Sequence, residues 1–562
     1  MITNLSSLKC IIGIAICFAM LSCENTSEKN AKGSTTDSTT RQLLQPDSLT
    51  KYTRVKLVTD MSLLSDEEKQ VLKLMIEAAS IMDDLFWKEA LPGTSKEEFL
   101  KGISDTSARS FALINYGPWD RLAGNKPFLK GASAKPDGAG YYPADMTKEE
   151  FEAWSHPLKT NPYTLVTRKT DGQLDAIWYH DAFKAEIIRA SDLLREASKI
   201  TTDAELKFYL EMRADALLSD NYNSSDVAWL GMKGNHLDLI IGPIENYEDQ
   251  LLGIRAAHES YVLVKDKEWS AKLDRYAALL PGLQKELPVD AVYKKDKVGS
   301  QSQLAAFDVV FYAGDCNAGS KTIAVNLPND AGIQQEHGTR RSQLKNAMRA
   351  KYDKILMPIA DELIVDEQRA NITFEAFFGN VMFHEVAHGL GIKNVLGTTK
   401  SVSDTLGEQH AWLEEAKADV LGLWLVTKLF EKGELNEGTL MDNYVTFLAS
   451  IFRSCRFGAS SAHGKANMMT FNFLQSKGAF ERMADSGKYK INLEVMKSAI
   501  DQLSGDIIEL QGNGSRLAVE MRQKETAIIG DVLKGDIEKL NKAGIPTDVV
   551  FEQGINVLGL AQ

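Results

Sequence analysis

The sequence predicts a mainly α-helical protein with a small sheet component, an α+β fold divided into at least two lobes. Long stretches with little proline carry the apolar spacing of helices, at 65–88, 181–218, 245–280 and 405–432. The segment 304–328 differs, because its runs LAAFDVVFYAG and KTIAVNLP are rich in β-branched and aromatic residues, which is typical of strands. A chain of 562 residues is also too long for one hydrophobic core.

The amino-terminal residues resemble a targeting segment. Lys9 precedes a short apolar stretch that cannot span a bilayer as a stable helix and that ends in MLSC. This ending resembles a bacterial lipoprotein signal, so we expect 1–22 to be removed and Cys23 to carry lipid. An ordinary cleaved signal peptide is the alternative. Residues 23–48, rich in Ser, Thr, Asn and charge, predict a flexible tether. The mature protein is then an exported lipoprotein on a bacterial membrane, facing the periplasm or the cell surface.

Charge and cysteine content narrow the function classes. The formal net charge of -13 argues against nucleic acid as a partner, because a phosphate-binding surface needs a basic patch. Beyond the targeting segment only Cys316 and Cys455 remain. They form either one disulfide or two buried thiols, and they are too few for a cysteine-rich metal site.

The central segment NITFEAFFGNVMFHEVAHGLGIKN carries a candidate metal site. Phe377, Val381, His384 and His388 follow a 4,3,4 spacing and so share one face of a helix. Two imidazoles four residues apart on a helix can reach the same ion. Glu385 lies on a neighbouring line of that helix, where it can touch a water molecule on the metal without ligating the metal. This is the HExxH arrangement of zinc peptidases, although the pattern also fits two hydrogen-bonded histidines.

A catalytic zinc needs a third protein ligand. A third histidine would complete HExxHxxGxxH, but that position holds Asn394, a poor zinc ligand. The following helical segment, 407–430, offers acids at Glu414, Glu415 and Asp419 instead. One carboxylate can bind zinc while another accepts the N–H of a ligand histidine. Two histidines and one acid around Zn²⁺, one ion per chain, favour hydrolysis of a peptide bond with Glu385 as general base.

With this site, the chain resembles the dipeptidyl peptidase III family over about 229–474. EEAKAD resembles the family motif EECRAE/D, whose second Glu is the zinc ligand, so the resemblance implies Glu415 as that ligand. Glu414 and Asp419 then stand beside the ligand histidines. The resemblance implies a zinc metallopeptidase that releases dipeptides from the amino end of oligopeptides.

Further motifs imply the substrate residues. IGPIENYED resembles the family's IGFIESYRD, which implies that Glu245 binds the substrate's free amino terminus and that Tyr247 stabilises the tetrahedral intermediate. AVNLPND resembles GINIPNYDD, which implies that Asn326 and Asn329 grip the substrate backbone. Each motif also has a plainer interpretation, such as a core phenol for Tyr247 or an Asn-Pro turn.

Two more residues follow from the same resemblance. AHGKAN resembles AHMQAR, which implies that His463 assists at the transition state. Trp229 stands at the right distance before Tyr247 to match a tryptophan of the substrate cleft.

The chain departs from the family pattern at two places. The family has a six-residue HExxGH, whereas this chain has the five-residue HEVAH. Ala331 stands where the family has an Asp that helps to bind the amino terminus. Two alternatives therefore stay open: a zinc hydrolase of altered specificity, and an exported peptide-binding protein without turnover.

The resemblance also implies two lobes with a cleft between them. We expect 49–345 to form mainly a mixed substrate-binding lobe with a small β-barrel-like core, and 346–510 to form a helical zinc-binding lobe. Helices in 511–562 are expected to return to the first lobe. A peptide would bind as an added strand, and closing of the lobes would bring Tyr247 to the metal.

Overall fold

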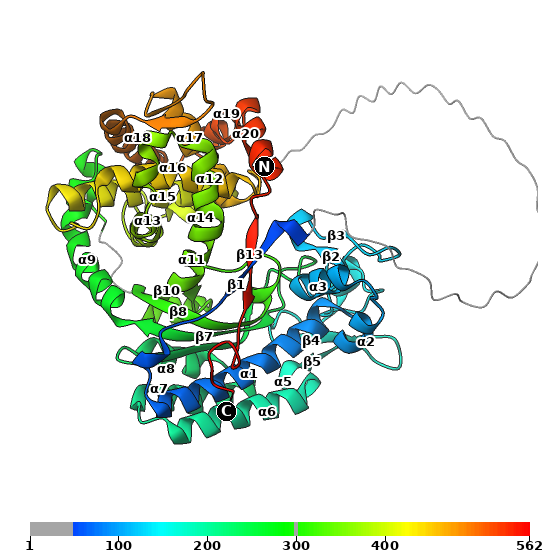
Figure 1. Ribbon diagram of the computed structural model, residues 1–562. Coiled ribbons are helices and arrows are strands. Elements are labelled where there is room, and N and C mark those ends of the chain that lie inside the picture. Colours follow the sequence, from blue (N-terminus) through cyan, green and yellow to red (C-terminus); the bar gives the residue numbers. More distant parts are fainter. Residues whose placement is uncertain (1–48, 297–301, 562) are drawn as a thin grey trace, which may run out of the picture. The chain divides into compact units, whose positions relative to one another are not determined.

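A five-stranded mixed sheet lies between two groups of helices (Figure 1). The computed structural model describes residues 49–296 and 302–561, all within one unit, Arg41–Gln562. In spatial order the strands are β6 (Leu237–Glu245), β7 (Ala257–Asp266), β8 (Ser302–Gly314), β10 (Thr339–Leu344) and β9 (Ala324–Leu327). The first three are antiparallel, β10 runs parallel to β8, and β9 runs antiparallel to β10. Within the described residues, β6 and β9 are the edges of this sheet, which is the small sheet component expected in the first lobe.

The first hydrophobic core joins this sheet to the helices on one of its faces. Long helix α1 (Asp66–Ala90) packs directly on β7 and β8. It begins at a capping box, in which the Ser65 side chain accepts the Glu68 N–H and the Glu68 carboxylate accepts the Ser65 N–H. The other elements of this part are α2 (Lys96–Lys101), α3 (Thr106–Asn115), α4 (Lys148–Ala153), α5 (Tyr179–Ala182), α6 (Lys184–Ile200), α7 (Ala204–Leu217), α8 (Asn223–Gly231), α10 (Ala331–His337), β2 (Trp119–Asp120), β3 (Lys126–Pro127), β4 (Thr164–Arg168) and β5 (Leu174–Trp178).

The second hydrophobic core is almost entirely helical and holds the HExxH segment. Its centre is α15 (His410–Glu431), which packs against α13 (Phe374–Ala387) and α17 (Ala462–Ser476). Around them lie α9 (Lys267–Glu286), α11 (Lys345–Lys351), α12 (Met357–Leu363), α14 (Val402–Leu406), α16 (Leu440–Cys455), α18 (Leu493–Asn513), α19 (Arg516–Thr526), α20 (Asp531–Lys542), β11 (Phe480–Arg482) and β12 (Tyr489–Ile491). The described chain thus has two cores, as expected of two lobes.

The first and last strands pair across the two cores. β1 (Tyr52–Lys56) runs parallel to β13 (Asp548–Glu552), and Figure 1 shows them side by side between the helix groups. On β13, Val549 belongs to the second core and Val550 to the first, as the alternation of a strand dictates. The two ends of the described chain therefore tie the cores together.

The segments divide between the cores differently from the expected ranges. α9 lies within 49–345, yet its residues Leu273 and Leu283 are buried in the helical core. α19 and α20 also pack there, through Val519 and Leu533, and only β13 and the tail after it reach the first core. The amphipathic stripe of each helix fixes where it packs, whatever its place in the sequence.

Most of the helices and strands predicted from the sequence are present, and one helix prediction is wrong. Helices are confirmed at 65–88, 181–218 and 405–432, the second as α6 and α7, and strands β8 and β9 cover the expected strand segment. The prediction of one helix over 245–280 is wrong, because β7 occupies its middle and only α9 is helical. β7 is buried on both faces, and a continuous apolar run does not distinguish such a strand from a buried helix.

Both cysteines beyond the targeting segment are free and buried, so the disulfide alternative is excluded. The signal segment 1–22, Cys23 and the tether 23–48 lie outside the described residues. Among the helices that the structure describes, none is long and apolar enough to cross a membrane.

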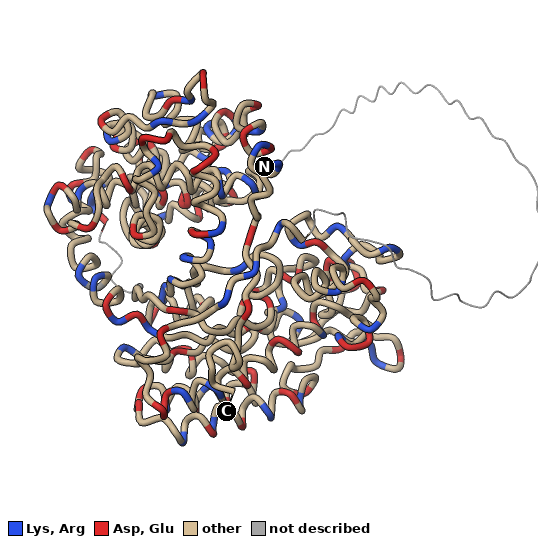
Figure 2. Tube along the Cα trace, in the orientation of Figure 1, with Lys and Arg blue, Asp and Glu red and all other residues tan. Residues whose placement is uncertain are grey.

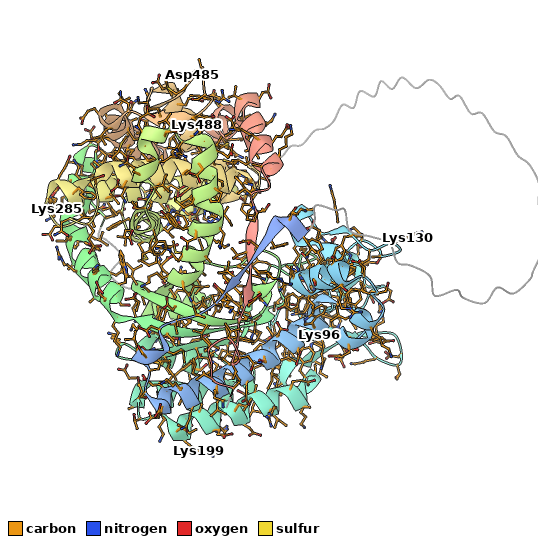
Figure 3. The ribbon with its side chains drawn as sticks, viewed as in Figure 1. Lys96, Lys130, Lys199, Lys285, Asp485 and Lys488 are labelled. Carbon is orange, nitrogen blue, oxygen red and sulfur yellow. The ribbon has the colours of Figure 1, made fainter. Side chains whose placement is uncertain are left out.

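Charged residues of both signs are mixed over the described chain (Figure 2). Several charged side chains labelled in Figure 3, such as Lys199 and Asp485, lie at the outline of the described chain.

We predict that Arg340→Met lowers the free energy of unfolding by about 3–5 kcal/mol, because it leaves a buried carboxylate unpaired. Arg340 on β10 is almost fully buried and pairs with Asp238 on β6 at 3.0 Å. Chemical denaturation measures the change. Replacing both partners, in Arg340→Met/Asp238→Leu, is expected to cost less than the single change, and a larger loss in the double variant would contradict this account.

Candidate metal centre

Helix α13 presents the HExxH residues at its carboxyl end. Thr373 caps its start by accepting the N–H of Ala376, and His388 forms its last capping position with helical backbone angles. The His388 N–H donates to the His384 carbonyl, so the two histidines keep the one-turn relation predicted from their spacing.

Close packing of α15 on α13 brings acids to these histidines. Gly422 of α15 faces the backbone of His384, and a Cβ at Gly422 would lie 2.9 Å from the backbone nitrogen of His384. Only glycine permits so close an approach. One and two turns before this contact, α15 carries Asp419 and Glu415, which therefore reach the imidazoles.

Each histidine of α13 is oriented by one acid of α15. His384 Nδ1 lies 2.7 Å from Asp419 Oδ1, and His388 Nδ1 lies 2.9 Å from Glu414 Oε1. The Nε2 atoms are left facing Glu415, whose Oε2 is 3.3 Å from that of His384 and 3.8 Å from that of His388. Acids that hold Nδ1 so that Nε2 points to a shared centre are typical of histidine metal sites.

The donor atoms fit a metal ion. Glu415 Oε2 is buried without a hydrogen-bond partner in the described chain, although imidazole nitrogens surround it. His463 of α17 also approaches it, with Nδ1 at 3.1 Å. Ligand atoms of His384, Glu415 and His463 lie within 4.8 Å of one another, and the His463 side chain is 65% exposed. His388 is the better-oriented fourth candidate because Glu414 fixes its ring.

The pKa of Glu415 also reflects the imidazoles that surround its carboxylate. Burial alone would raise it, but the neighbouring His384 and His463 lower the pKa below its usual range. The carboxylate is therefore ionised, as a metal ligand must be.

Lys417 supports this centre and was missed in the sequence. Its buried Nζ lies 2.8 Å from Glu414 Oε1 and donates to the carbonyl of Leu390, just after α13. Gln511 donates to the other Glu414 oxygen at 2.9 Å. Burial opposes ionisation of Glu414, but Lys417 and His388 hold its pKa well below the usual range. A lysine inside EEAKAD, three residues after Glu414, was the available signal.

A cavity of about 620 Å³ joins this centre to the sheet. From the helical side it is lined by His384, Glu385, His388, Glu415 and His463. From the sheet side it is lined by Glu245, Tyr247, Asn326 and Asn329, and by Arg341. The structure therefore brings together nearly all of the residues selected from the sequence.

Arg341 connects the two sides. It lies on β10 opposite Asn326 of β9, and its guanidinium donates to the Glu385 carbonyl. Its Nε lies 3.7 Å from Glu385 Oε2, so the proposed base faces a cation that the sequence motifs did not reveal.

Carboxylates gather in the sheet side of the same cavity. Glu245 is joined there by Glu259 of β7 and by Asp315, just after β8. Burial raises the pKa of Glu245, and burial with the charges of Asp315 and Glu245 raises that of Glu259 well above its usual range. Burial and Glu248 raise the pKa of Asp315 to about 7. Glu259 and Asp315 were also missed, although an acid inside an apolar strand is a usable signal.

Trp229 is placed away from the metal. It is 3% exposed, its Nε1 donates to Asp238 at 2.8 Å, and the guanidinium of Arg340 lies over its ring at 4.4 Å. It lines a small separate cavity that also touches Asn329. The ring therefore does not line the cavity of the metal centre.

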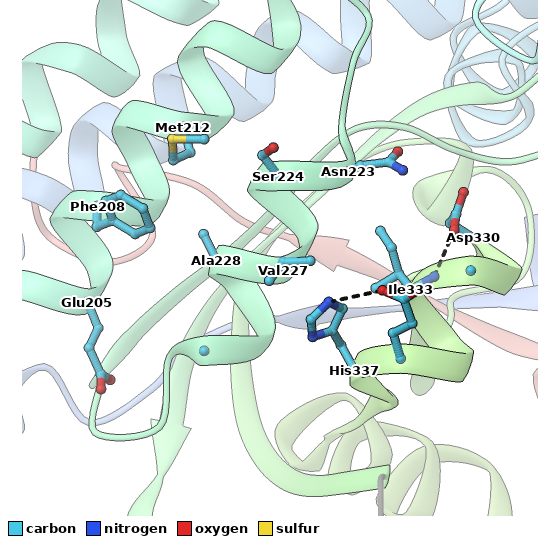
Figure 4. Close-up of a pocket in the computed structure, with 13 residues that line it drawn as sticks. Glu205, Phe208, Met212, Asn223, Ser224, Val227, Ala228, Asp330, Ile333 and His337 are labelled. Atoms are coloured by element: carbon cyan, nitrogen blue, oxygen red, sulfur yellow. Dashed lines mark hydrogen bonds and ion pairs between the residues drawn. The ribbon is translucent and has the colours of Figure 1, made fainter.

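A larger cavity, of about 740 Å³, lies elsewhere, between α7, α8 and α10 (Figure 4). Phe208, Met212 and Ile333 contribute to its wall, together with His337. None of the metal-centre residues lines it, so size alone does not locate the chemistry.

We predict that Gly422→Ala separates α13 from α15 and weakens metal binding. The added methyl would overlap backbone, so we expect a loss of about 1–3 kcal/mol in the free energy of unfolding. Denaturation and a zinc titration measure the two effects. Gly535→Ala is the matched control, because that glycine lies inside α20 with open space around it and should be neutral or stabilising. Equal behaviour of the two variants would refute the packing argument.

Comparisons with known proteins agree with this geometry. A model of peptidase family M49 matches residues 158–396. The structure of dipeptidyl peptidase III from Caldithrix abyssi superposes with a TM-score of 0.87 at 35% identity, covering 91% of this chain and 99% of that one. The enzyme from Corallococcus sp. strain EGB gives 0.76 at 35% identity, covering 90% and 96%.

Two sequence relatives complete the comparison. Nudix hydrolase 3 of Arabidopsis thaliana is 32% identical over 91% of this chain and 74% of its own length. The activity in that name refers to the Arabidopsis protein. Human dipeptidyl peptidase 3 is 32% identical over a shorter part, 22% of this chain and 16% of that protein. Together with the two solved structures, these matches show that this chain belongs to peptidase family M49, the dipeptidyl peptidase III family of metallopeptidases.

Proposed function

We propose that this protein is a zinc-dependent dipeptidyl peptidase that releases dipeptides from the amino end of oligopeptides. The observation that carries the proposal is the single cavity that holds His384, Glu415 and Glu385 together with the carboxylate cluster of the sheet. A metal centre with a base supports hydrolysis, and an anionic cluster within the same cavity supports a fixed position for a cationic amino terminus.

The sheet side offers the contacts that a free amino terminus needs. Glu245, together with the interacting pair of Glu259 and Asp315, supplies negative charge for an ammonium group, and Asn329 lies beside Glu245. β9 is a sheet edge in the described chain, and it carries Asn326. A peptide backbone added along this edge would run from the ammonium site towards the metal centre.

The chemistry assigns one task to each residue. Zinc bound by His384, His388 and Glu415 would supply a Lewis acid. Glu385 takes the proton from the attacking water and passes it to the leaving amine. Arg341 holds the end of the catalytic helix through the Glu385 carbonyl.

Tyr247 and His463 are proposed to stabilise negative charge at the transition state. Tyr247 is 72% exposed, and the nearby Glu245 raises the pKa of its phenol, so the hydroxyl remains a hydrogen-bond donor at neutral pH. An exposed donor on the sheet side fits a cleft that closes over substrate.

Altered specificity is the second candidate, and the start of α10 favours it. Ala331 provides no carboxylate, and the neighbouring Asp330 uses its own to cap α10 by accepting the Ile333 N–H. Recognition of the amino terminus then depends on Glu245, Glu259 and Asp315 alone. With fewer contacts to fix the amino terminus, a peptide could bind in another register and be cleaved at a different bond.

We also propose that the mature protein is attached to a bacterial membrane by lipid on Cys23. The sequence MLSC and the polar tether after it support this proposal. Intact mass of the protein from membranes should exceed the polypeptide mass, and Cys23→Ser should release the protein from the membrane fraction. An unmodified cysteine in the native protein would contradict it.

Product analysis tests the dipeptidyl peptidase assignment. A free-amine hexapeptide should lose dipeptides in succession, its N-acetylated twin should resist, and Glu385→Gln should reduce kcat by several orders of magnitude. Mass spectrometry identifies the fragments. Equal cleavage of both peptides, or cleavage at internal bonds, would instead support the altered-specificity candidate, and tight zinc binding without any cleavage would support a binding protein.

A pH dependence follows from the carboxylate cluster. As pH falls through about 7, Asp315 gains a proton and the coupled pair with Glu259 loses negative charge, so ammonium binding weakens. The inhibition constant of a free-amine dipeptide should therefore rise about tenfold or more from pH 8 to pH 6. Asp315→Asn should flatten this change. A variant that keeps the wild-type dependence would refute the role of Asp315.

A further inference from the structure

A second cavity, of about 480 Å³, adjoins the metal centre, and none of Glu245, Glu259 and Asp315 lines it. It shares His384, Glu385 and His463 with the first cavity, so the two are continuous at the reacting position. Its walls come from α13, α16 and α17. If the amino terminus of a peptide lies in the first cavity, the part beyond the cleaved bond has this second cavity in front of it.

One part of the second cavity is apolar, although polar residues such as Asn380, Asp419 and Asn467 also line it. Phe377 and Val381 of α13 face Phe447 and Ile451 of α16 across it, and Phe457, which is 44% exposed, lies at its edge. Such a wall favours apolar side chains in the leaving part of a peptide.

One cation lies in this apolar wall. Arg453 of α16 lines the cavity, with its guanidinium 6.0 Å from the Phe377 ring. Its Nε is buried without a hydrogen-bond partner, and no carboxylate of the described residues lies within ion-pair distance of it. Burial lowers the pKa of its guanidinium. By contrast, nearby Arg456 donates to the carbonyls of Ile545 and Pro546.

No acidic side chain of the described residues forms an ion pair with the Arg453 guanidinium. Asp548 is the one acid whose field stabilises the Arg453 cation. That carboxylate already pairs with Lys351 at 2.9 Å and accepts the hydroxyl of Ser320. An arginine with a buried Nε that lacks a partner, and with no ion pair, is costly, so its presence in a cavity beside the reacting position points to a ligand with a carboxylate.

The spacing between Phe377 and His384 along α13 indicates how long such a ligand would be. Phe377, beside Arg453, precedes His384 by seven residues, which is two helical turns or about 10 Å. An extended peptide advances about 3.3 Å per residue, so a carboxylate at Arg453 belongs to a chain that continues about three residues beyond the cleaved bond.

We propose that Arg453 binds the free carboxyl terminus of short peptide substrates, while the apolar cavity holds the residues between that terminus and the cleaved bond. The inference rests on the proposed function. It names the preferred substrate class as oligopeptides of about five residues, with apolar residues after the second and a free carboxylate at the end.

The test compares three substrates with the zinc-loaded full-length protein. These are a pentapeptide with apolar residues at positions three to five, its carboxyl-terminal amide, and a dipeptidyl arylamide that has no leaving peptide. We expect kcat/KM for the acid to exceed that for the amide about tenfold or more. Arg453→Met should abolish this preference and Arg453→Lys should keep part of it. Arg195→Met, an exposed arginine of α6, should leave it unchanged.

The arylamide separates the possible failures. If wild type and Arg453→Met cleave it equally while only wild type prefers the acid, the proposal holds. If wild type does not prefer the acid, or if Arg453→Met retains the preference, the carboxylate site is wrong while the dipeptidyl peptidase assignment stands. If the arylamide and the peptides are not cleaved at all, the proposed function fails. Calorimetric binding of the intact acid and amide to wild type and Arg453→Met then decides the carboxylate site by itself.

Discussion

The contact between α13 and α15 at Gly422 is the constraint on which the rest of the site depends. Because no side chain separates the two helices there, Glu415 and Asp419 reach the imidazoles of the HExxH segment. Asp419 and Glu414 then turn both rings so that their Nε2 atoms face the same carboxylate oxygen. Lys417, which is buried, balances the charge of Glu414. The candidate metal centre therefore results from the packing of two helices.

Charges of opposite sign line the two cavities that meet at this centre. Carboxylates of the five-stranded sheet line one cavity, an arginine without an ion pair lies in the apolar part of the other, and the two cavities meet at His384 and Glu385. A peptide has the complementary arrangement, with an ammonium group at one end and a carboxylate at the other. Under the two proposals above, these charges would orient a bound peptide with its amino terminus at the sheet and its carboxylate at Arg453.

The metal centre could be predicted from the sequence because helical spacing is local. Residues four apart in HEVAH, and Glu415 and Asp419 one turn apart, share a helix face in any fold that keeps the helices. Glu259, Asp315 and Arg453 could not be predicted in this way, since each acquires its role from neighbours distant in sequence. The strand β7 was mistaken for helix for a related reason: burial on both faces removes the alternation that identifies a strand. Trp229 has the spacing of a cleft residue, yet its indole hydrogen bond and the guanidinium above it hold it outside the cavity of the metal centre.

Zinc affinity measured by competition with a chromophoric chelator tests the central claim most directly, because two histidines compete for one ligand position. His388 is oriented by Glu414, whereas His463 is exposed and lies close to the same Glu415 oxygen. The account predicts one zinc per wild-type chain, an affinity about a hundredfold or more lower in His388→Gln, and a change of less than about tenfold in His463→Gln. The reverse order, or a wild-type chain that binds no zinc, would contradict the metal centre described above.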